Sequence, residues 1–345
     1  MLYVGIDLHK QTIVIRGVNQ ARELVSHGKF FCQETTRIVE FFRQLGRFQA
    51  VIEATASYEW LWELLEPLAE RLVLAHPGKM RVIAESRNKN DKVDAHVLAV
   101  FLALDMIPAA HRPTPRQREH RALVRHRSYL RRGTTSAKNK IRRILSDYNA
   151  DRKDLFTSEG LQYLAEFKVS AAARLVLDQL LAKWEHLEKQ ITALDKALKA
   201  FAKKAPAAEK EAREVLASIP QVGDGTVEVV VSELGDVRRF SSAKKVAAYA
   251  GLVPGQRESA GHKKELGISK QGSRLLRWSL VEAAWRLVRK SPRWCTIFEG
   301  ISKRRGKKKA IVAVARRLLS VMVAMLRSGK SYRFAASEVQ AGLNA

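Results

Sequence analysis

The sequence has few of the residues that mark a secreted, zinc-binding or membrane protein. Its two cysteines, Cys32 and Cys295, lie far apart and form no Cys-x-x-Cys pair, which argues against a disulfide framework and a cysteine zinc site. The N-terminus has no basic leader, and Asp7 interrupts its first apolar run, so we expect no signal peptide. The apolar stretch AIVAVARRLLSVMVAML is split by Arg316 and Arg317, which argues against a membrane-spanning helix.

Acidic residues are scarce relative to basic ones, and the imbalance is confined to one part of the chain. The 345 residues include 62 Lys and Arg but only 35 Asp and Glu, a net charge of +27. Residues 1–105 hold 13 of each sign, so residues 106–345 hold the entire excess, 49 basic against 22 acidic. A charge of this size predicts a nucleic acid as partner. An anionic membrane is the alternative, but no amphipathic helix with an aromatic face supports it.

The first hundred residues alternate between short β-branched or apolar runs and helical patterns, which predicts a mixed α/β domain ending near residue 107. The near-continuous apolar run FQAVIEA is typical of a strand buried on both faces. The ranges predicted as strands are 3–7, 12–18, 27–31, 48–54 and 71–76, and those predicted as helices are 35–46, 58–71 and 94–104.

Proline is absent between Pro115 and Pro206, which favours long helices over this region. Residues 171–201 repeat apolar side chains every three or four positions, as a coiled coil does. This seam could pair with the basic helix over 112–143 folded back antiparallel, but we favour a dimerisation arm. Residues 112–143 hold twelve basic side chains and one acid, and we expect part of them to bind nucleic acid. The residues that we predict to contact nucleic acid are Arg125, Arg127, Arg131, Arg132, Lys138, Lys140, Arg142 and Arg143.

Residues 206–345 predict a second globular unit that is entirely helical. In SIPQVGDGT, Gly223 and Gly225 lie between two predicted helices and resemble the turn of a helix-hairpin-helix element, whose backbone N–H groups can bind a phosphate. An ordinary corner between two helices is the alternative. The stretch that follows is rich in Gly, Ser and Lys and predicts a loop that contacts a nucleic-acid backbone. The phosphate contacts expected there are Lys263, Lys264, Lys270 and Arg274.

Four acidic side chains of the first domain predict a metal site. Asp7 and Glu53 end predicted strands, where ligands of α/β sheets usually bind, whereas Asp91 and Asp94 lie one turn apart at a helix start. Clustered carboxylates repel unless cations neutralise them, and oxygen ligands suit Mg²⁺ or Mn²⁺. Alternatively each acid caps a helix or pairs with a base, and Asp91 could be an N-cap. The ordered set favours metal-dependent cutting of a phosphodiester.

Histidine and serine offer further reactive groups without a distinguishing pattern. His9 and His96 lie near the acids in sequence, but such histidines are more often packing residues, so we place neither in the metal set. Three serines of the Gly-rich stretch, Ser259, Ser269 and Ser273, are candidate nucleophiles. Residue chemistry alone does not separate them.

Five ordered motifs resemble those of a known family: YVGIDLHK, VIEATASYEW, RNKNDKVDAHVLA, LASIPQVGDGT and AAYAGLVPGQRES. The chain is similar to the Piv-like DEDD transposases of the insertion-sequence family called IS-one-ten. The likeness extends over nearly the whole chain and includes the basic middle and the coiled coil. One departure lies in the hairpin, which usually reads Pro-Gly-x-Gly in this family, whereas Gln221 replaces the first Gly here.

The resemblance implies three parts. These are a RuvC-like, RNase H-type catalytic domain over 1–107, a basic helical coiled-coil region over 108–205, and a helical transposase domain over 206–345. The last part would contain the helix-hairpin-helix element and a serine loop. We expect a cytoplasmic, nucleoid-associated bacterial protein with no membrane partner.

The resemblance also implies a chemistry and its partners. Mg²⁺ would be bound by the tetrad Asp7, Glu53, Asp91 and Asp94, and Ser259 would attack a DNA phosphate to form a covalent phosphoserine link. The site would be composite, with the tetrad of one subunit facing the serine of another in a dimer, or a tetramer in the synaptic complex. A noncoding bridge RNA would pair with donor and target DNA, as in guided nucleases.

Three other functions compete with this interpretation. A Holliday-junction nuclease with the same acids would hydrolyse DNA with water and need no serine. A non-catalytic nucleic-acid scaffold would tolerate loss of all four acids. A sugar kinase or actin-like ATPase is suggested by GIDLHK, but the first hundred residues lack a Gly-rich nucleotide loop and the positive charge argues against it.

Overall fold

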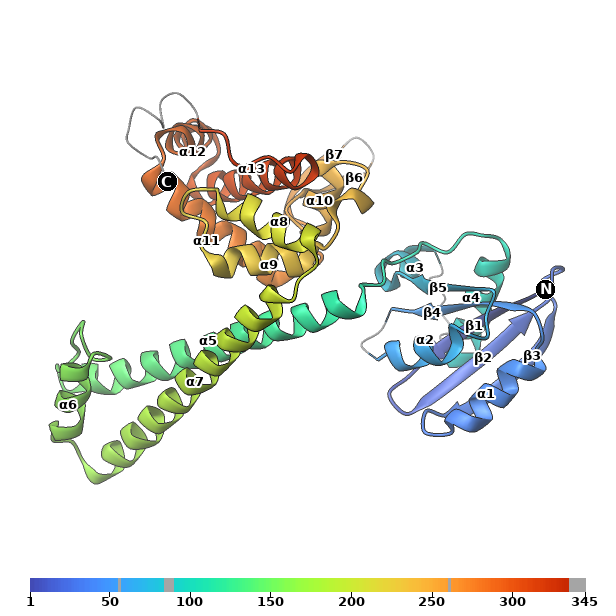
Figure 1. The fold of residues 1–345 in the computed structure, drawn as a ribbon, viewed down its shortest axis with the longest axis horizontal. Helices are drawn as coiled ribbons and strands as arrows, with labels where there is room; N and C mark the ends of the chain where they lie inside the picture. The colour runs from blue at the N-terminus through green and yellow to red at the C-terminus, as the bar shows by residue number, and fades with distance from the viewer. Residues whose placement is uncertain (55–56, 84–89, 260–261, 335–345) are drawn as a thin grey trace. The chain divides into compact units, whose positions relative to one another are not determined.

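The computed structural model describes residues 1–54, 57–83, 90–259 and 262–334. The chain forms two compact units, Met1–Arg112 and Pro113–Ala345, and Figure 1 traces the path through both. Within those ranges no helix combines the length and the apolar composition that crossing a membrane requires.

The first unit is a five-stranded sheet with helices on both faces. In chain order its elements are β1 (Leu2–Leu8), β2 (Thr12–Val18), β3 (Leu24–Phe31), α1 (Thr35–Gln44), β4 (Phe48–Glu53), α2 (Glu59–Leu65), β5 (Arg71–Ala75), α3 (Pro77–Ile83) and α4 (Asp91–Ala103). The strand order is β3-β2-β1-β4-β5, with β1, β2 and β3 antiparallel and β1, β4 and β5 parallel. The predicted α/β class and all five predicted strands are confirmed.

The two faces of this sheet are covered by different helices. Ile6 and the other residues of its face pack against α1 and α2, whereas Val51 and the residues of the opposite face pack against Leu98 of α4. Helix α4 lies directly on β1, because a Cβ added at Gly5 would be 2.0 Å from the carbonyl oxygen of Ala95. The start of α4 is therefore held against the end of β1.

The second unit begins with an arm of helices α5 (Pro115–Asp147), α6 (Ser158–Glu166) and α7 (Ala171–Lys203). Thr114 caps α5 by accepting a hydrogen bond from the Gln117 N–H, and Pro115 begins the helix. Figure 1 shows α5 and α7 side by side. They run antiparallel, since Arg131 pairs with Glu188 whereas Arg127, further back on α5, pairs with Asp195, further along α7.

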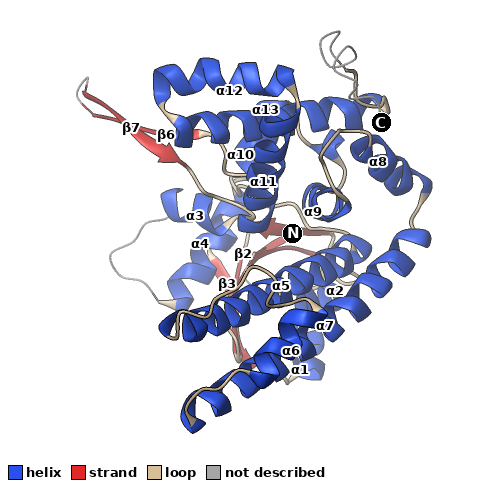
Figure 2. Cartoon of the chain, turned by 90° about the vertical axis from the view of Figure 1, so that its left-hand side faces the viewer, coloured by secondary structure: helices blue, strands red, loops and turns tan. Residues whose placement is uncertain are grey.

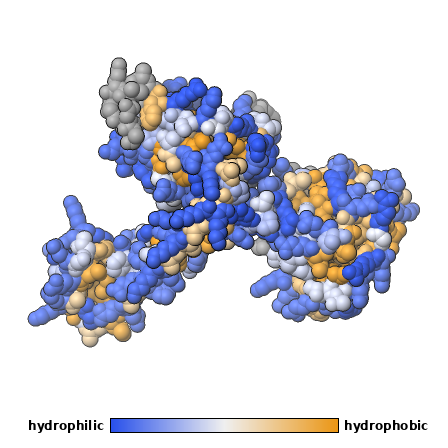
Figure 3. Space-filling model, in the orientation of Figure 1, coloured by the Kyte–Doolittle hydropathy of each residue, from blue (hydrophilic) through white to orange (hydrophobic). Residues whose placement is uncertain are grey.

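The apolar seam of α7 therefore packs against α5 of its own chain. Gly133 of α5 lets Leu187 approach, because a Cβ there would be 3.0 Å from the Leu187 Cδ1. The favoured prediction, that this seam pairs with a second chain, is wrong for the seam itself; the antiparallel alternative is the one found. Spacing alone identifies an apolar stripe but not the helix that covers it. Exposed hydrophobic side chains occur instead near α6, namely Tyr148, Leu175 and Val176. Figure 3 shows hydrophobic residues at this end of the arm.

The remaining elements form a helical bundle and one hairpin. They are α8 (Ala207–Ala217), α9 (Asp224–Leu234), the 3-10 helix η1 (Val237–Arg239), α10 (Ala243–Tyr249), β6 (Pro254–Ser259), β7 (His262–Ile268), α11 (Arg274–Lys290), α12 (Pro292–Arg305) and α13 (Lys307–Ser328). The apolar stretch interrupted by Arg316 and Arg317 lies in α13, whose buried residues form much of the core.

The predicted all-helical composition of this unit is wrong, because β6 and β7 form an antiparallel hairpin. Figure 2 shows this hairpin extending from the helices. Its strands read PGQRES and HKKELGI, with few apolar residues, so hydrophobic alternation gives no strand signal. The Gly-rich stretch therefore has the sequence features of a loop although it folds as a hairpin.

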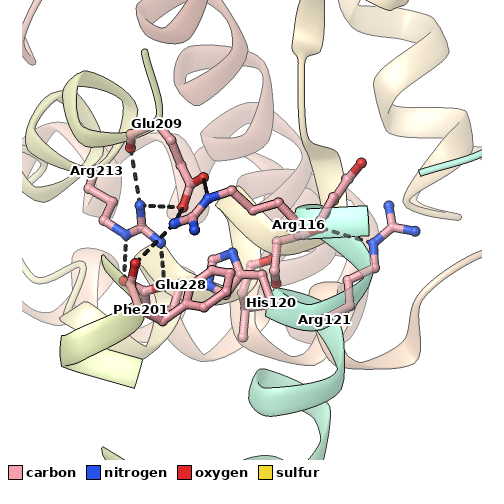
Figure 4. Close-up of polar contacts among 10 residues, drawn as sticks. Arg116, His120, Arg121, Phe201, Glu209, Arg213 and Glu228 are labelled. Carbon is pink, nitrogen blue, oxygen red and sulfur yellow. Dashed lines mark hydrogen bonds and ion pairs between the residues drawn. The ribbon is translucent and has the colours of Figure 1, made fainter. Parts of the chain in front are cut away.

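A network of ion pairs joins α5 to α8 and α9 (Figure 4). Arg213 Nε donates to Glu228 Oε1 at 2.7 Å, and Arg116 Nε donates to Glu209 Oε2 at 2.6 Å. His120, which is buried, hydrogen-bonds to Glu228. Burial alone would raise the pKa of both glutamates, but hydrogen bonds and charges from their basic partners hold each pKa below its ordinary value. The network therefore depends on ionised carboxylates.

Candidate active site

Asp7 and Glu53 lie at the ends of adjacent parallel strands, as the last but one residue of β1 and the last residue of β4, on the face that α4 covers. The register pairs Ile6 with Ile52, so the next residues, Asp7 and Glu53, lie side by side at the strand ends. Side chains alternate along a strand, so Asp7 shares the face of Gly5, against which α4 packs. Asp7 is buried and Glu53 is partly buried. The predicted end of a strand at Glu53 is confirmed, whereas β1 continues one residue beyond Asp7, to Leu8.

The other two acids lie in the first turn of α4. Asn90 is the N-cap, and its Oδ1 accepts a hydrogen bond from the Val93 N–H at 2.9 Å. Asp91 is therefore not the cap, and both Asp91 and Asp94 are first-turn residues three positions apart. Carboxylates are favoured there by the partial positive charge of a helix N-terminus. This local effect helps two like charges to share one turn.

Asp7 and Asp91 come together around a histidine. His9 Nε2 lies 3.1 Å from Asp7 Oδ2 and 3.2 Å from Asp91 Oδ1. The ligand atoms of these three residues all lie within 4.8 Å of one another. The sequence places His9 outside the metal set, whereas the structure places its ring between two of the predicted ligands. In the sequence, the only indication that His9 belongs to the site is its position two residues after Asp7. A histidine that merely forms part of a turn could occupy the same position.

The electrostatics of this cluster suit a cation. Burial raises the pKa of Asp7, and the negative charges of Asp91 and Asp94 raise it further, although His9 opposes them. A buried carboxylate whose ionised form is disfavoured by neighbouring carboxylates is stabilised when a cation binds. A carboxylate and imidazole set of this size fits one divalent ion. Asp7, His9 and Asp91 are the residues that would be the ligands of such an ion.

Ser259 lies in the second compact unit. It is the last residue of β6, and its Cα partner on β7 is His262. Lys263 and Lys264, two of the predicted phosphate contacts, belong to β7. The side chains of residues 256–265 lie outside what the structure describes, so the directions of the Ser259 hydroxyl and of both ammonium groups remain predictions.

Most of the basic side chains chosen on α5 already have partners within the chain. Arg125 donates two hydrogen bonds to Glu233, and Arg142 donates to Asp151 and to two backbone carbonyls. Arg127 and Arg131 pair with acids of α7, and Arg143 pairs with Asp147 one turn along. Lys138 lies over the rings of Phe156 and Trp184, at 4.6 and 5.2 Å from their centroids. These contacts stabilise the arm and leave less positive charge for a polyanion.

Four of the predicted contacts differ in this respect. In the part of the chain that the structure describes, these four side chains form no ion pair with an acid: Arg132, Lys140, Lys270 and Arg274. All four are exposed. Of the predicted nucleic-acid contacts, they are therefore the ones best able to bind a phosphate.

The turn between α8 and α9 has a different backbone from the one predicted. Gly223 has φ −79° as the N-cap of α9, and Gly225 lies within the helix, so neither uses a left-handed conformation. The positive φ, 63°, belongs to Gln221, the residue that replaces a glycine of the resembled hairpin. The guanidinium groups of Arg286 and Arg127 lie 3.9 Å from the Cβ positions of Gly223 and Gly225. A phosphate role for the two glycines remains a prediction.

Comparison with known proteins finds transposases. Residues 4–150 match the DEDD transposase domain of the IS110 type, and residues 213–299 match the transposase IS116/IS110/IS902 family. The transposase for insertion sequence element IS1111A of Coxiella burnetii is 26% identical, with 96% of this chain and 91% of the relative covered. A pilin gene-inverting protein of Moraxella bovis is 25% identical, with 96% and 97% covered. The transposase for IS1328 of Yersinia enterocolitica is 26% identical, with 81% and 82% covered.

Proposed function

Because the chain belongs to the IS110/IS116 family of transposases, we propose that it recombines DNA through a metal-bound acidic tetrad and a serine nucleophile. The tetrad consists of Asp7, Glu53, Asp91 and Asp94, and the nucleophile is Ser259. The observation that carries the proposal is the meeting of Asp7, from a strand end, with Asp91, from a distant helix start, around His9. The Moraxella relative is named for the inversion of a gene, which is a rearrangement of DNA.

The proposed chemistry exchanges one phosphodiester for another. The Ser259 Oγ attacks a backbone phosphorus, so that a bond from Oγ to phosphorus forms while the bond from phosphorus to one deoxyribose oxygen breaks. The hydroxyl proton leaves to solvent, and the released deoxyribose oxygen takes up a proton. The reverse attack by another deoxyribose hydroxyl restores the serine. The number of phosphodiester bonds is unchanged, so rejoining needs neither ATP nor an oxidant.

Divalent cations such as Mg²⁺ or Mn²⁺, when bound at the tetrad, would neutralise the phosphate and stabilise the attacking and leaving oxygens. Asp7 would bind such an ion from the sheet and Asp91 from the helix. The buried position of Asp7 keeps its carboxylate fixed in one direction, since side chains packed against α4 have little freedom.

We also propose two partners beyond donor and target DNA. One is a second copy of the chain, so that the tetrad of one subunit acts with the Ser259 of another in a dimer or a synaptic tetramer. The placement of the tetrad in Met1–Arg112 and of Ser259 in the second unit supports such a division. The other is a noncoding guide RNA, which the net charge of +27 would attract as it attracts DNA.

Trapping of protein–DNA adducts tests the nucleophile. The protein is produced from a plasmid that includes its gene and the natural flanking DNA, so that any noncoding transcript is present. After denaturation, the wild type is expected to remain attached to labelled DNA, whereas Ser259→Ala gives no adduct. Ser269→Ala is the matched control, because the Ser269 Oγ is buried without a hydrogen-bond partner among the described residues and its loss should not disturb folding.

Two outcomes would contradict this proposal. An adduct that survives Ser259→Ala assigns the nucleophile elsewhere. Cleavage that is unchanged in Ser259→Ala and yields no adduct in the wild type identifies hydrolysis by water, as in a junction nuclease.

A further inference from the structure

An open cleft of 280 Å³ lies between α5 and the start of α11. We call it the α5–α11 cleft. It is lined by Arg125, Ser128 and Arg132 of α5 and by Ser273, Arg274 and Leu275 at α11. We propose that this cleft binds a single-stranded segment of nucleic acid, with its phosphates against the arginines and an unpaired base stacked on Trp278. The inference rests on the proposed function only in taking nucleic acid as the ligand.

The charge of the cleft is positive and only partly compensated. Arg125 uses its Nε and one terminal nitrogen to bind Glu233. Arg132 and Arg274 form no ion pair with any acid among the described residues, and both are exposed. Burial lowers the pKa of Arg277, and the nearby charge of Arg274 lowers it further, which is a sign of crowded cations. Such a group attracts phosphates, whose binding releases counterions.

An exposed aromatic side chain belongs to the same helix as Arg274. Trp278 is 59% exposed and lies one turn beyond Arg274 on α11, so both occupy the same side of the helix. On α5, Tyr129 is 61% exposed and follows Ser128 of the cleft in sequence. Exposed aromatic rings beside arginines form the stacking surfaces on which proteins bind unpaired bases.

The aromatic ring distinguishes a single strand from a duplex. In a duplex both faces of a base are covered by its neighbours, so an indole on the protein surface cannot stack on it without opening the helix. An unpaired base offers its face at no such cost. Arginines alone would bind either form through phosphates. The combination of Arg132, Arg274 and Trp278 therefore favours an unpaired strand.

The test measures binding without chemistry. A fluorescein-labelled 12-nucleotide DNA strand, the RNA of the same sequence, and the corresponding DNA duplex are titrated with full-length protein in EDTA at fixed salt. Trp278→Ala is expected to weaken binding of a single strand by about fivefold or more, and that of the duplex by less than about twofold, because phosphate contacts are unchanged. Trp278→Phe should restore most of the loss, because it keeps a stacking ring.

Matched variants separate stacking from charge. Tyr148→Ala removes an exposed aromatic ring near α6 and should leave both affinities unchanged. Arg132→Gln and Arg274→Gln should each reduce the slope of the logarithm of affinity against the logarithm of salt by about 0.7 for a single strand. Tighter binding of the RNA than of the DNA strand would identify a guide as the occupant, and the opposite order a displaced DNA strand.

Other results would overturn the proposal. Equal losses for strand and duplex in Trp278→Ala, no loss for either, or no rescue by Trp278→Phe would each exclude stacking on this residue. Asp7→Asn separates this proposal from the catalytic one, because it should abolish DNA cleavage yet bind single strands like the wild type. If Trp278→Ala binds single strands normally while Asp7→Asn does not cleave DNA, the proposed binding of a strand at the α5–α11 cleft is wrong. The proposed recombination of DNA would then still be supported.

Discussion

Arg125 donates two hydrogen bonds to the buried carboxylate of Glu233, from Nε to Oε1 at 2.8 Å and from Nη2 to Oε2 at 2.9 Å. Glu233 is 1% exposed, so Arg125→Ala would leave a buried charge short of its main partner. We expect a loss of about 2–3 kcal/mol in the free energy of unfolding, measured with urea. Arg132→Ala, on an exposed side of the same helix, should change it by less than about 0.5 kcal/mol. Equal unfolding midpoints for the two variants would contradict the structural role of Arg125.

Removal of Asp7 should abolish stabilisation by metal. Mg²⁺ that binds the folded protein alone raises its melting temperature, so we expect a rise in the wild type and none in Asp7→Asn. In EDTA, Asp7→Asn should melt no lower than the wild type, because burial and two neighbouring carboxylates disfavour the Asp7 charge. Asp105→Asn is the control, since Asp105 is an exposed partner of Arg71 in the same unit. The same Mg²⁺ shift in Asp7→Asn as in the wild type would remove Asp7 from the ligands.

Substitution of Gly5 should separate the two halves of the tetrad. A Cβ at this position would lie 2.0 Å from the Ala95 carbonyl oxygen and 2.5 Å from the Ala99 nitrogen, and helix backbone cannot yield as a flexible side chain does. Gly5→Ala should therefore cost about 3 kcal/mol or more and move Asp91 away from Asp7. Gly300→Ala, with open space around it in α12, should gain up to about 1 kcal/mol. Thermal unfolding and DNA cleavage measure the two effects, and wild-type values in Gly5→Ala would show that α4 can shift.

Acid should weaken the junction between the arm and the helical bundle. The pKa of Glu228 is lowered in the folded chain, because hydrogen bonds from His120 and Arg213 outweigh burial. A carboxylate of this kind contributes stability above its unfolded pKa of about 4.3, and the contribution is lost as pH falls through the lower folded pKa. We expect the free energy of unfolding to fall more steeply below about pH 4.3 in the wild type than in Glu228→Gln. Parallel curves for the two proteins would contradict the assignment.

The strand-end and helix-start positions of the four acids could be predicted because each is fixed by local sequence. The apolar run before Glu53 marks a strand, and the pattern after Asp91 marks a helix. Parallel strands then bring Asp7 beside Glu53 by topology alone. The contact of His9 with Asp91 could not be predicted in this way, since it depends on how closely α4 lies on β1.

The other features that the sequence did not predict depend on pairing between residues far apart in the chain. Arg125 and Arg127 look available for phosphates in the sequence, yet they bind acids 108 and 68 positions away. The partner of the α7 seam is likewise decided by where α5 folds back. The hairpin of β6 and β7 is held by backbone pairing between charged segments. The pattern of apolar and polar residues does not predict such strands.

Helix α5 belongs at once to the arm and to the bundle, since it packs against α7 along much of its length and against α9 near its beginning. Its 33 residues extend over about 50 Å, and they have no proline after the first turn. If α5 moves as a rigid helix, it pivots where it is held to the bundle, at the Arg116–Glu209 and His120–Glu228 contacts. A tilt of about 5° there displaces the α6 end by about 4 Å, so a ligand that pulls on the far tip also applies torque to the bundle.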